Sequence, residues 1–146
     1  MTSKPLFHRQ ETPYSCVPAC LRMVLAGLGK DLSEAELRAR CDCTVFGTEA
    51  FKAVDALKKL GFSRSQKTNL SLTELTDLLA SGVYPIVYIN LRPIDGIQCN
   101  HAVVVVAVTD TTCTIFDPLS AERSLPLSAF ETGWQLMNRL AILVLD

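Results

Sequence analysis

Apolar residues in the first half of the chain recur every three or four positions, which predicts helices. Four stretches show this spacing, and glycines follow three of them. In two stretches a Ser precedes a Glu by three residues, the signature of a capping box. The predicted helices lie at 16–28, with Pro18 in the first turn; at 33–41, with Ser33 and Glu36 as capping box; at 48–60, with Thr48 as N-cap and Phe51, Val54, Leu57 and Leu60 on one face; and at 71–81, with Ser71 and Glu74 as capping box.

After residue 84 the pattern changes to short runs rich in β-branched residues, which predict strands. The run HAVVVVAV at 101–108 is apolar on both faces and predicts a central strand that is covered on both sides. A second strand at 112–118 follows a turn at 110–112, so these two strands should form a hairpin. The other predicted elements are a strand at 85–90, a short helix at 127–134 with Ser128 and Glu131 as capping box, and a closing strand at 140–145.

Helices followed by strands predict an α+β fold, in which N-terminal helices pack on a C-terminal antiparallel sheet. With 146 residues the chain has the length of one domain, and we expect residues 1–146 to form a single domain. Apolar residues make up 49% of the sequence, which excludes a disordered chain. The net charge of −1 excludes an electrostatic binder of nucleic acid or of a membrane surface.

The chain shows no targeting or membrane segment. Residues 1–15 lack the apolar core of a secretory signal. The apolar runs at 102–108 and 140–145 are far shorter than the roughly 18 residues that a membrane helix needs. We therefore expect a cytoplasmic protein without stable membrane insertion. Its oligomeric state is open.

The six cysteines, at positions 16, 20, 41, 43, 99 and 113, are expected to be reduced thiols, because no secretory signal precedes them. A structural zinc site is the main alternative use. Its cysteines usually come in pairs with two to four residues between them, joined by a second such pair or a histidine pair. Only one residue separates Cys41 from Cys43, and the only histidines, His8 and His101, are too far apart in the sequence to form such a pair. We therefore expect neither a metal nor a cofactor.

Cys16 lies where loop residues give way to the first apolar helix. Proline is tolerated only in the first turn of a helix, so Pro18 fixes the beginning of this helix near residues 15–17. The unpaired N–H groups and the macrodipole of a helix N-terminus favour a thiolate, which is the nucleophilic form of cysteine. A small buried apolar residue is the alternative role, and it fits Cys20, one turn further on, better than Cys16.

Three further residues would complete a site around this thiol. His101 opens the central strand at the rim of the sheet, where its ring could serve Cys16 as a base. Asp117 ends the next strand, and in a hairpin it would lie beside His101 and orient the ring. Gln10, six positions before Cys16, could join the backbone N–H of Cys16 as an oxyanion donor. Taken singly, each residue has a simpler explanation. His101 could be a strand-end histidine whose hydrogen bonds are satisfied, Asp117-Pro118 could begin a turn, and Gln10 could be a surface residue.

The ordered set of motifs resembles the papain-like cysteine peptidases that process double-glycine leaders of bacteriocin precursors. The matching segments are QETPYSCVPACLRMVL, GTEAFKAVDALKKLGF, HAVVVV, IFDP and LSAFETGW, and together they extend over roughly residues 8–145. The resemblance implies a bacterial cysteine peptidase that acts on a peptide or protein. It also implies Cys16 as nucleophile, His101 as general base and acid, Asp117 as orienting residue and Gln10 as oxyanion donor.

The sequence departs from that family at two points. The family usually has Gly directly after the nucleophile, whereas this chain has Val17 followed by Pro18. Leader-processing members are commonly fused to a membrane transporter, whereas this chain resembles a stand-alone form. Two alternatives therefore stay open. One is a thiol acyltransferase or amidase that uses the same triad, and the other is a non-catalytic peptide-binding domain of the same fold.

Overall fold

A six-stranded antiparallel sheet forms the centre of the computed structural model, which describes residues 4–146. The strands are ordered β1-β6-β2-β3-β4-β5. The sheet is made of β1 (Gln66–Asn69), β2 (Ile86–Asn90), β3 (Asn100–Val108), β4 (Thr112–Phe116), β5 (Glu122–Pro126) and β6 (Leu140–Leu143). The predicted α+β architecture is confirmed.

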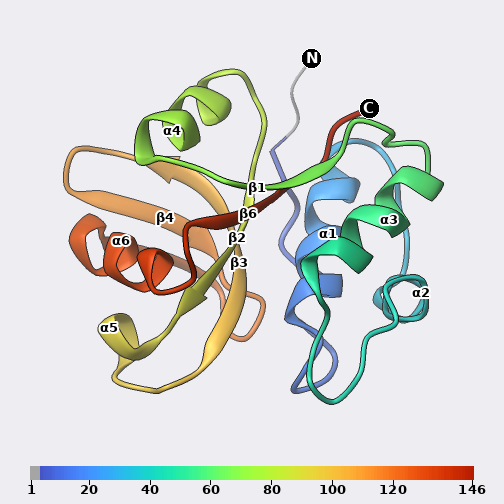
Figure 1. Ribbon diagram of the computed structural model, residues 1–146, viewed down its shortest axis with the longest axis horizontal. Helices are drawn as coiled ribbons and strands as arrows, with labels where there is room; N and C mark the ends of the chain where they lie inside the picture. Colours follow the sequence, from blue (N-terminus) through green and yellow to red (C-terminus); the bar gives the residue numbers. More distant parts are fainter. Residues whose placement is uncertain (1–3) are drawn as a thin grey trace.

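Helices cover both faces of this sheet (Figure 1). One layer holds α1 (Cys16–Gly27), α2 (Glu34–Arg40) and α3 (Ala50–Lys59), and the other holds α4 (Leu72–Ala80), α5 (Arg92–Asp95) and α6 (Leu127–Gln135). Successive side chains of β3 enter two different apolar clusters. Val104 packs with the α1 layer, and Val103 packs with Trp134 of α6. The prediction of a central strand covered on both sides is therefore confirmed.

The ends of the predicted helices agree with the structure only in part. The capping box at Ser71 and Glu74 is complete, and α1 begins where Pro18 requires. At α2 the Ser33 hydroxyl accepts the Glu36 N–H, but the Glu36 carboxylate pairs with Arg40 instead of reaching back.

The predictions for α3 and α6 need correction. Helix α3 begins after Glu49, so Thr48 is not its N-cap. Phe51 is 46% exposed, because the buried face of this later-starting helix is formed mainly by alanines, with Val54 and Leu57. Helix α6 begins at Leu127, directly after β5, and Ser128 lies inside its first turn. A capping box from Ser128 to Glu131 is therefore wrong.

Three elements were not predicted from the sequence: β1, β5 and α5. The first two are the edge strands of the sheet. The predicted closing strand, β6, lies inside the sheet between β1 and β2. Among residues 4–146, no helix combines the length and the apolar character that crossing a lipid bilayer requires.

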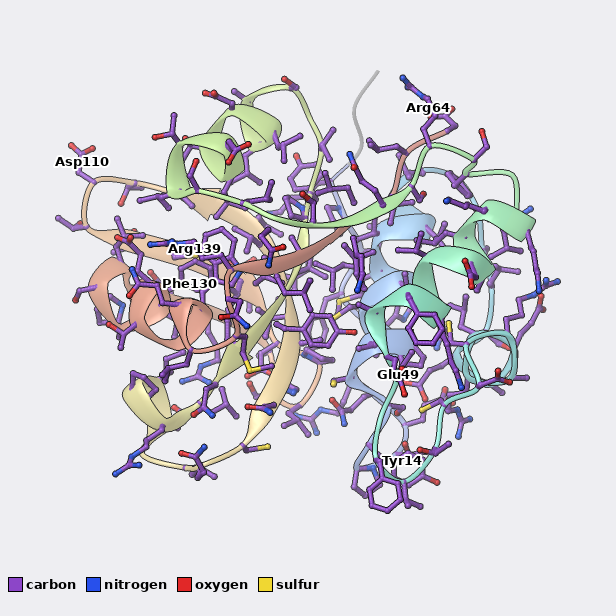
Figure 2. The ribbon with its side chains drawn as sticks, in the orientation of Figure 1. Tyr14, Glu49, Arg64, Asp110, Phe130 and Arg139 are labelled. Atoms are coloured by element: carbon purple, nitrogen blue, oxygen red, sulfur yellow. The ribbon has the colours of Figure 1, made fainter. Side chains whose placement is uncertain are left out.

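The β3–β4 hairpin turns where the sequence predicts it, with the Thr109 N–H donating to the Thr112 carbonyl at 2.9 Å. Figure 2 shows Asp110 at its tip, far from the opposite end of the hairpin, where His101 is the second residue of β3. The pairing of the two strands shifts by one residue between Val105 and Ala107, which is a β-bulge. The hairpin therefore has two registers, one on each side of the bulge.

Candidate active site

Cys16 is the first residue of α1, at the end of the helix that faces the sheet rim. The preceding residue, Ser15, does not cap the helix with its side chain. Its hydroxyl instead bonds to the Thr12 N–H and carbonyl, at 3.1 and 3.2 Å. The first turn contains no acidic residue. No capping side chain and no acidic residue therefore offsets the N-terminal dipole of α1 at Cys16.

Three of the other thiols, Cys20, Cys41 and Cys113, differ from Cys16 because they are buried. Cys20 is fully buried one turn further along α1, where its Sγ lies 3.5 Å from the Ala102 carbonyl oxygen and burial raises its pKa. Burial likewise raises the pKa of Cys41 and of Cys113 to about 12. Cys16 is only partly buried, and all six cysteines are free thiols. The sequence-based contrast between Cys16 and Cys20 is confirmed in their burial.

His101 and Asp117 form a buried pair on the sheet side of the cleft. Each is 3% exposed, and His101 Nε2 lies 2.7 Å from Asp117 Oδ1. Asp117 also accepts the Leu119 N–H at 2.9 Å, in the tight turn that follows β4. Since Nε2 is taken by Asp117, Nδ1 is the ring atom left for Cys16, which lines the same cavity as His101 and helps to raise the pKa of its imidazole. The expected proximity of His101 and Asp117 is observed.

The charges at this site support one another. Burial disfavours the imidazolium, but the hydrogen bonds to Asp117 and Cys16 outweigh this effect and raise the pKa of His101 to about 9. Burial also disfavours ionised Asp117, yet the hydrogen bond from His101 and its charge hold the pKa of Asp117 below the ordinary value. Imidazolium and carboxylate are therefore both charged at neutral pH, and the imidazolium stabilises a neighbouring thiolate.

Gln10 lies in the loop before α1, next to the turn that carries Asp117. Its backbone N–H donates to the Pro118 carbonyl at 2.8 Å, and its side-chain Nε2 donates to the Thr12 carbonyl at 2.7 Å. The second N–H of this amide has no acceptor among residues 4–146. Gln10 does not line the cavity beside Cys16. The loop before α1 is thus held against the turn that carries Asp117, and one N–H of the Gln10 side chain is left as a donor.

A buried glutamate anchors the same loop from the helical layer. Glu34 is 1% exposed, and its Oε1 accepts the backbone N–H of Glu11 at 2.9 Å. Its other oxygen forms an ion pair with Arg38 Nε at 3.3 Å. Arg38 also pairs with the Glu11 carboxylate at 3.4 Å. Sequence analysis did not single out this cluster, because its members are ordinary surface residue types that meet only in the folded chain.

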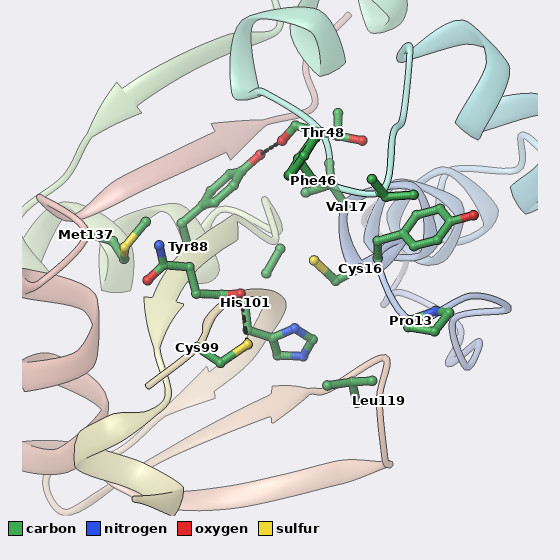
Figure 3. Close-up of a pocket in the computed structure, with 15 residues that line it drawn as sticks. Pro13, Cys16, Val17, Phe46, Thr48, Tyr88, Cys99, His101, Leu119 and Met137 are labelled. Carbon is green, nitrogen blue, oxygen red and sulfur yellow. Dashed lines mark hydrogen bonds between the residues drawn. The ribbon is translucent and has the colours of Figure 1, made fainter. Parts of the chain in front are cut away.

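Cys16 and His101 open into a cavity of about 370 Å³ between α1 and the ends of β2 and β3 (Figure 3). The Tyr88 hydroxyl forms part of its wall and donates to the Thr48 carbonyl at 3.1 Å. Phe46, at the rim, is 97% exposed. Val17, the residue that departs from the family pattern, is 2% exposed and faces the cavity beside Cys16. Apart from His101, the lining is formed by uncharged residues, mainly Pro13, Tyr14, Val45, Leu119 and Met137.

The contacts of Asp117 include a residue that sequence analysis missed. Arg123 Nη1 lies 3.2 Å from Asp117 Oδ2, and the same guanidinium forms a two-pronged ion pair with Asp95. No local pattern marks Arg123 or Asp95, since one lies on an edge strand and the other on a four-residue helix.

Comparison with known proteins places this geometry in a family. The Peptidase C39 family profile matches residues 5–144. The peptidase domain of Streptococcus ComA, described as a bifunctional ABC transporter involved in a quorum sensing pathway, is 28% identical. Its TM-score is 0.79, and the alignment covers 96% of this chain and 98% of that one. A search of curated proteins found no match.

Two further solved structures share the fold at lower identity. A double glycine motif protease from an AMS/PCAT transporter, solved in complex with the leader peptide, is 19% identical. Its TM-score is 0.78, over 97% of this chain and 91% of that one. A C39-like peptidase from Bacillus anthracis is 17% identical, with a TM-score of 0.82 over 97% and 94% of the two chains. The papain-like fold inferred from the sequence is confirmed. The chain belongs to the Peptidase C39 family and is a cysteine peptidase.

Proposed function

We propose that Cys16, His101 and Asp117 are the catalytic triad of this peptidase and that Gln10 completes its oxyanion hole. The observation that carries the proposal is the arrangement around one imidazole, with Asp117 2.7 Å from Nε2 and Cys16 lining the same cavity as the ring. A nucleophile, a base and an orienting carboxylate in this order are the parts that acyl transfer requires.

In the proposed mechanism the Cys16 thiolate attacks the carbonyl carbon of the scissile bond. The backbone N–H of Cys16 and the free N–H of Gln10 donate to the oxygen on which negative charge develops. His101 then gives its Nδ1 proton to the leaving amine, and the C–N bond breaks. A water molecule, deprotonated by His101, hydrolyses the thioester and regenerates the thiol.

We propose a peptide with a double-glycine leader as the substrate class. The ComA domain and the leader-bound protease have the same fold over nearly the full chain, and the first is 28% identical. The cavity beside Cys16, whose lining is uncharged apart from His101, supports binding of an apolar peptide segment. We propose that residues 1–146 act as one catalytic domain, because both apolar clusters share the same sheet, and that it works in the cytoplasm, in keeping with its six free thiols.

The test is cleavage of a synthetic peptide that contains a double-glycine leader, followed by mass spectrometry of both products. The wild-type chain should cut one bond, whereas Cys16→Ala and His101→Ala should each lose at least about 10³-fold in rate while staying folded by circular dichroism. Cys43→Ala, which removes a partly buried thiol that does not line the cavity, is the matched control and should keep its activity.

Two results would overturn the proposal. Cleavage that survives in Cys16→Ala would assign the chemistry to another group. A reaction that joins the acyl product to an added small amine, with no hydrolysis in its absence, would favour the acyltransferase. A wild type that cuts other peptides but not this leader would overturn the substrate class and leave the triad standing.

A further inference from the structure

Arg123 joins two carboxylates that come from different elements. Its Nη1 lies 3.2 Å from Asp117 Oδ2 and 3.0 Å from Asp95 Oδ2, and its Nη2 lies 2.7 Å from Asp95 Oδ1. The planar guanidinium donates to Asp95 through both Nη atoms and to Asp117 through Nη1 alone. The two oxygens of Asp117 are thus divided, with Oδ1 facing His101 and Oδ2 facing Arg123.

The strand register explains how Arg123 reaches this place. In the β4–β5 pairing Arg123 lies opposite Ile115, two residues before Asp117. Residues two apart in a strand point to the same face, so Arg123 and Asp117 are diagonal neighbours. Asp95 approaches from α5, in the helical layer opposite to α1 (Figure 1). The contact therefore links the sheet edge, the turn after β4 and a short helix.

The four groups form a row of alternating charge: Asp95, Arg123, Asp117 and protonated His101. The inner pair is 3% exposed, whereas the side chains of Arg123 and Asp95 are 28% and 29% exposed. Solvent therefore weakens the outer pair without abolishing it. The hydrogen bond from Arg123 is the main cause that lowers the pKa of Asp95, and the charge of His101 lowers it further.

We propose that Arg123 and Asp95 are positioning residues of the triad, acting through Asp117 on His101. Arg123 fixes the rotation of the Asp117 carboxylate and draws charge away from the imidazolium. Asp95 fixes Arg123 and offsets part of its charge. The inference rests on the proposed triad. According to it, Arg123 and Asp95 determine the pH above which the enzyme loses activity.

Other titratable groups line the cavity or lie next to it and belong in the same balance. Cys16 and Cys20 approach from α1, Tyr88 comes from β2, and Cys99 precedes β3 in the same cavity wall. Burial raises the pKa of Cys20 and of Tyr88, so both are neutral near pH 9. Asp117, Arg123 and Asp95 therefore keep their charges in this range and are the fixed charges that act on the ring.

The test compares Arg123→Ala with Asp95→Asn in the pH dependence of kcat/KM for the leader peptide, measured at low ionic strength. Removing the cation favours the imidazolium, so the alkaline limb of Arg123→Ala should move up by about half a pH unit. Removing the outer anion leaves Arg123 unbalanced, so the limb of Asp95→Asn should move down by a smaller amount. Both variants should lose about 3- to 10-fold in kcat/KM, because Asp117 is held less firmly.

Arg123→Lys and Arg40→Ala serve as controls. Lysine keeps the positive charge but cannot form the two parallel hydrogen bonds of a guanidinium. Arg123→Lys should therefore keep the alkaline limb of the wild-type pH profile and recover only part of the wild-type kcat/KM. Arg40 forms an ion pair with Glu36 on α2, and its removal should change neither quantity.

Shifts of the two alkaline limbs in the same direction, or no shift in either, would overturn the inference, since a purely structural role predicts no opposite signs. That outcome leaves the triad intact as long as His101→Ala is inactive. Activity in His101→Ala would instead refute the proposed function itself.

Discussion

The two sides of the cleft are built in different ways. On the helical side, Cys16 is partly exposed, and no side-chain cap occupies the end of α1. On the sheet side, His101 and Asp117 are each 3% exposed and are held by several hydrogen bonds. The attacking atom must reach a substrate and therefore has to be accessible. The charged partners gain strength from a low dielectric, and burial is tolerable for them only because their polar atoms are paired.

The comparison predicts that the helical side, besides holding the nucleophile, stabilises the oxyanion. Gln10→Ala should lower kcat by about 10²–10³-fold with an unchanged melting temperature, because one preorganised donor is lost. Arg9→Ala is the matched control: its guanidinium donates to the Ser120 carbonyl at 3.1 Å, and its loss should leave kcat near wild type. Near wild-type turnover of Gln10→Ala would remove this residue from the mechanism.

On the sheet side the decisive variant is Asp117→Asn, which keeps the shape and removes the charge. We expect a loss of roughly 10–10³-fold in kcat/KM, less than in a serine protease, because the thiol needs less help to ionise. The imidazolium is present below its raised pKa of about 9 and is lost above it, so the wild-type alkaline limb should lie near that pH.

Without the Asp117 charge the His101 proton is held less tightly, and the alkaline limb should move to lower pH. The measurement is a pH–rate profile of both enzymes with the same peptide. If Asp117→Asn keeps the wild-type rate and the wild-type alkaline limb, Asp117 has only a structural role in the turn.

A smaller effect sharpens the contrast within α1 itself. Iodoacetamide near neutral pH should alkylate Cys16 at least about 10-fold faster than the exposed Cys99, because access alone does not produce a thiolate. Cys20, fully buried one turn away, should react only on unfolding. Mass-spectrometric mapping of the modified cysteines gives the order, and earlier labelling of Cys99 would contradict activation by the helix.

The parts of this molecule that local rules determine could be predicted. Pro18 predicted where α1 begins, and the apolar run predicted the central position of β3. The predicted hairpin brought Asp117 close to His101. The edge strands follow no such rule. In β1 the segment QKTN contains no apolar residue, and in β5 only Leu125 is buried. An edge strand with solvated side chains shows no alternation for sequence analysis to detect.

The ion pairs around the proposed triad could not be predicted either, for a different reason. Asp95 and Arg123 are 28 residues apart, and their meeting depends on how α5 is placed against the sheet. Glu34 and Glu11 are 23 residues apart and come together in the same way. Charged residues of this kind look like any solvated surface until the tertiary packing is known.

The β-bulge in β3 determines which faces of the sheet the His101 and Asp117 side chains point to. On the site's side of the bulge Val104 pairs with Phe116, and one further step puts Asp117 across from Val103, on the same face as His101. On the other side Ala107 pairs with Thr114, and that register, carried through unbroken, would put Asp117 across from Val104. The acid would then point to the opposite face from the base. One surplus residue at Val106 therefore decides whether the hairpin carries an acid–base pair or two unrelated side chains.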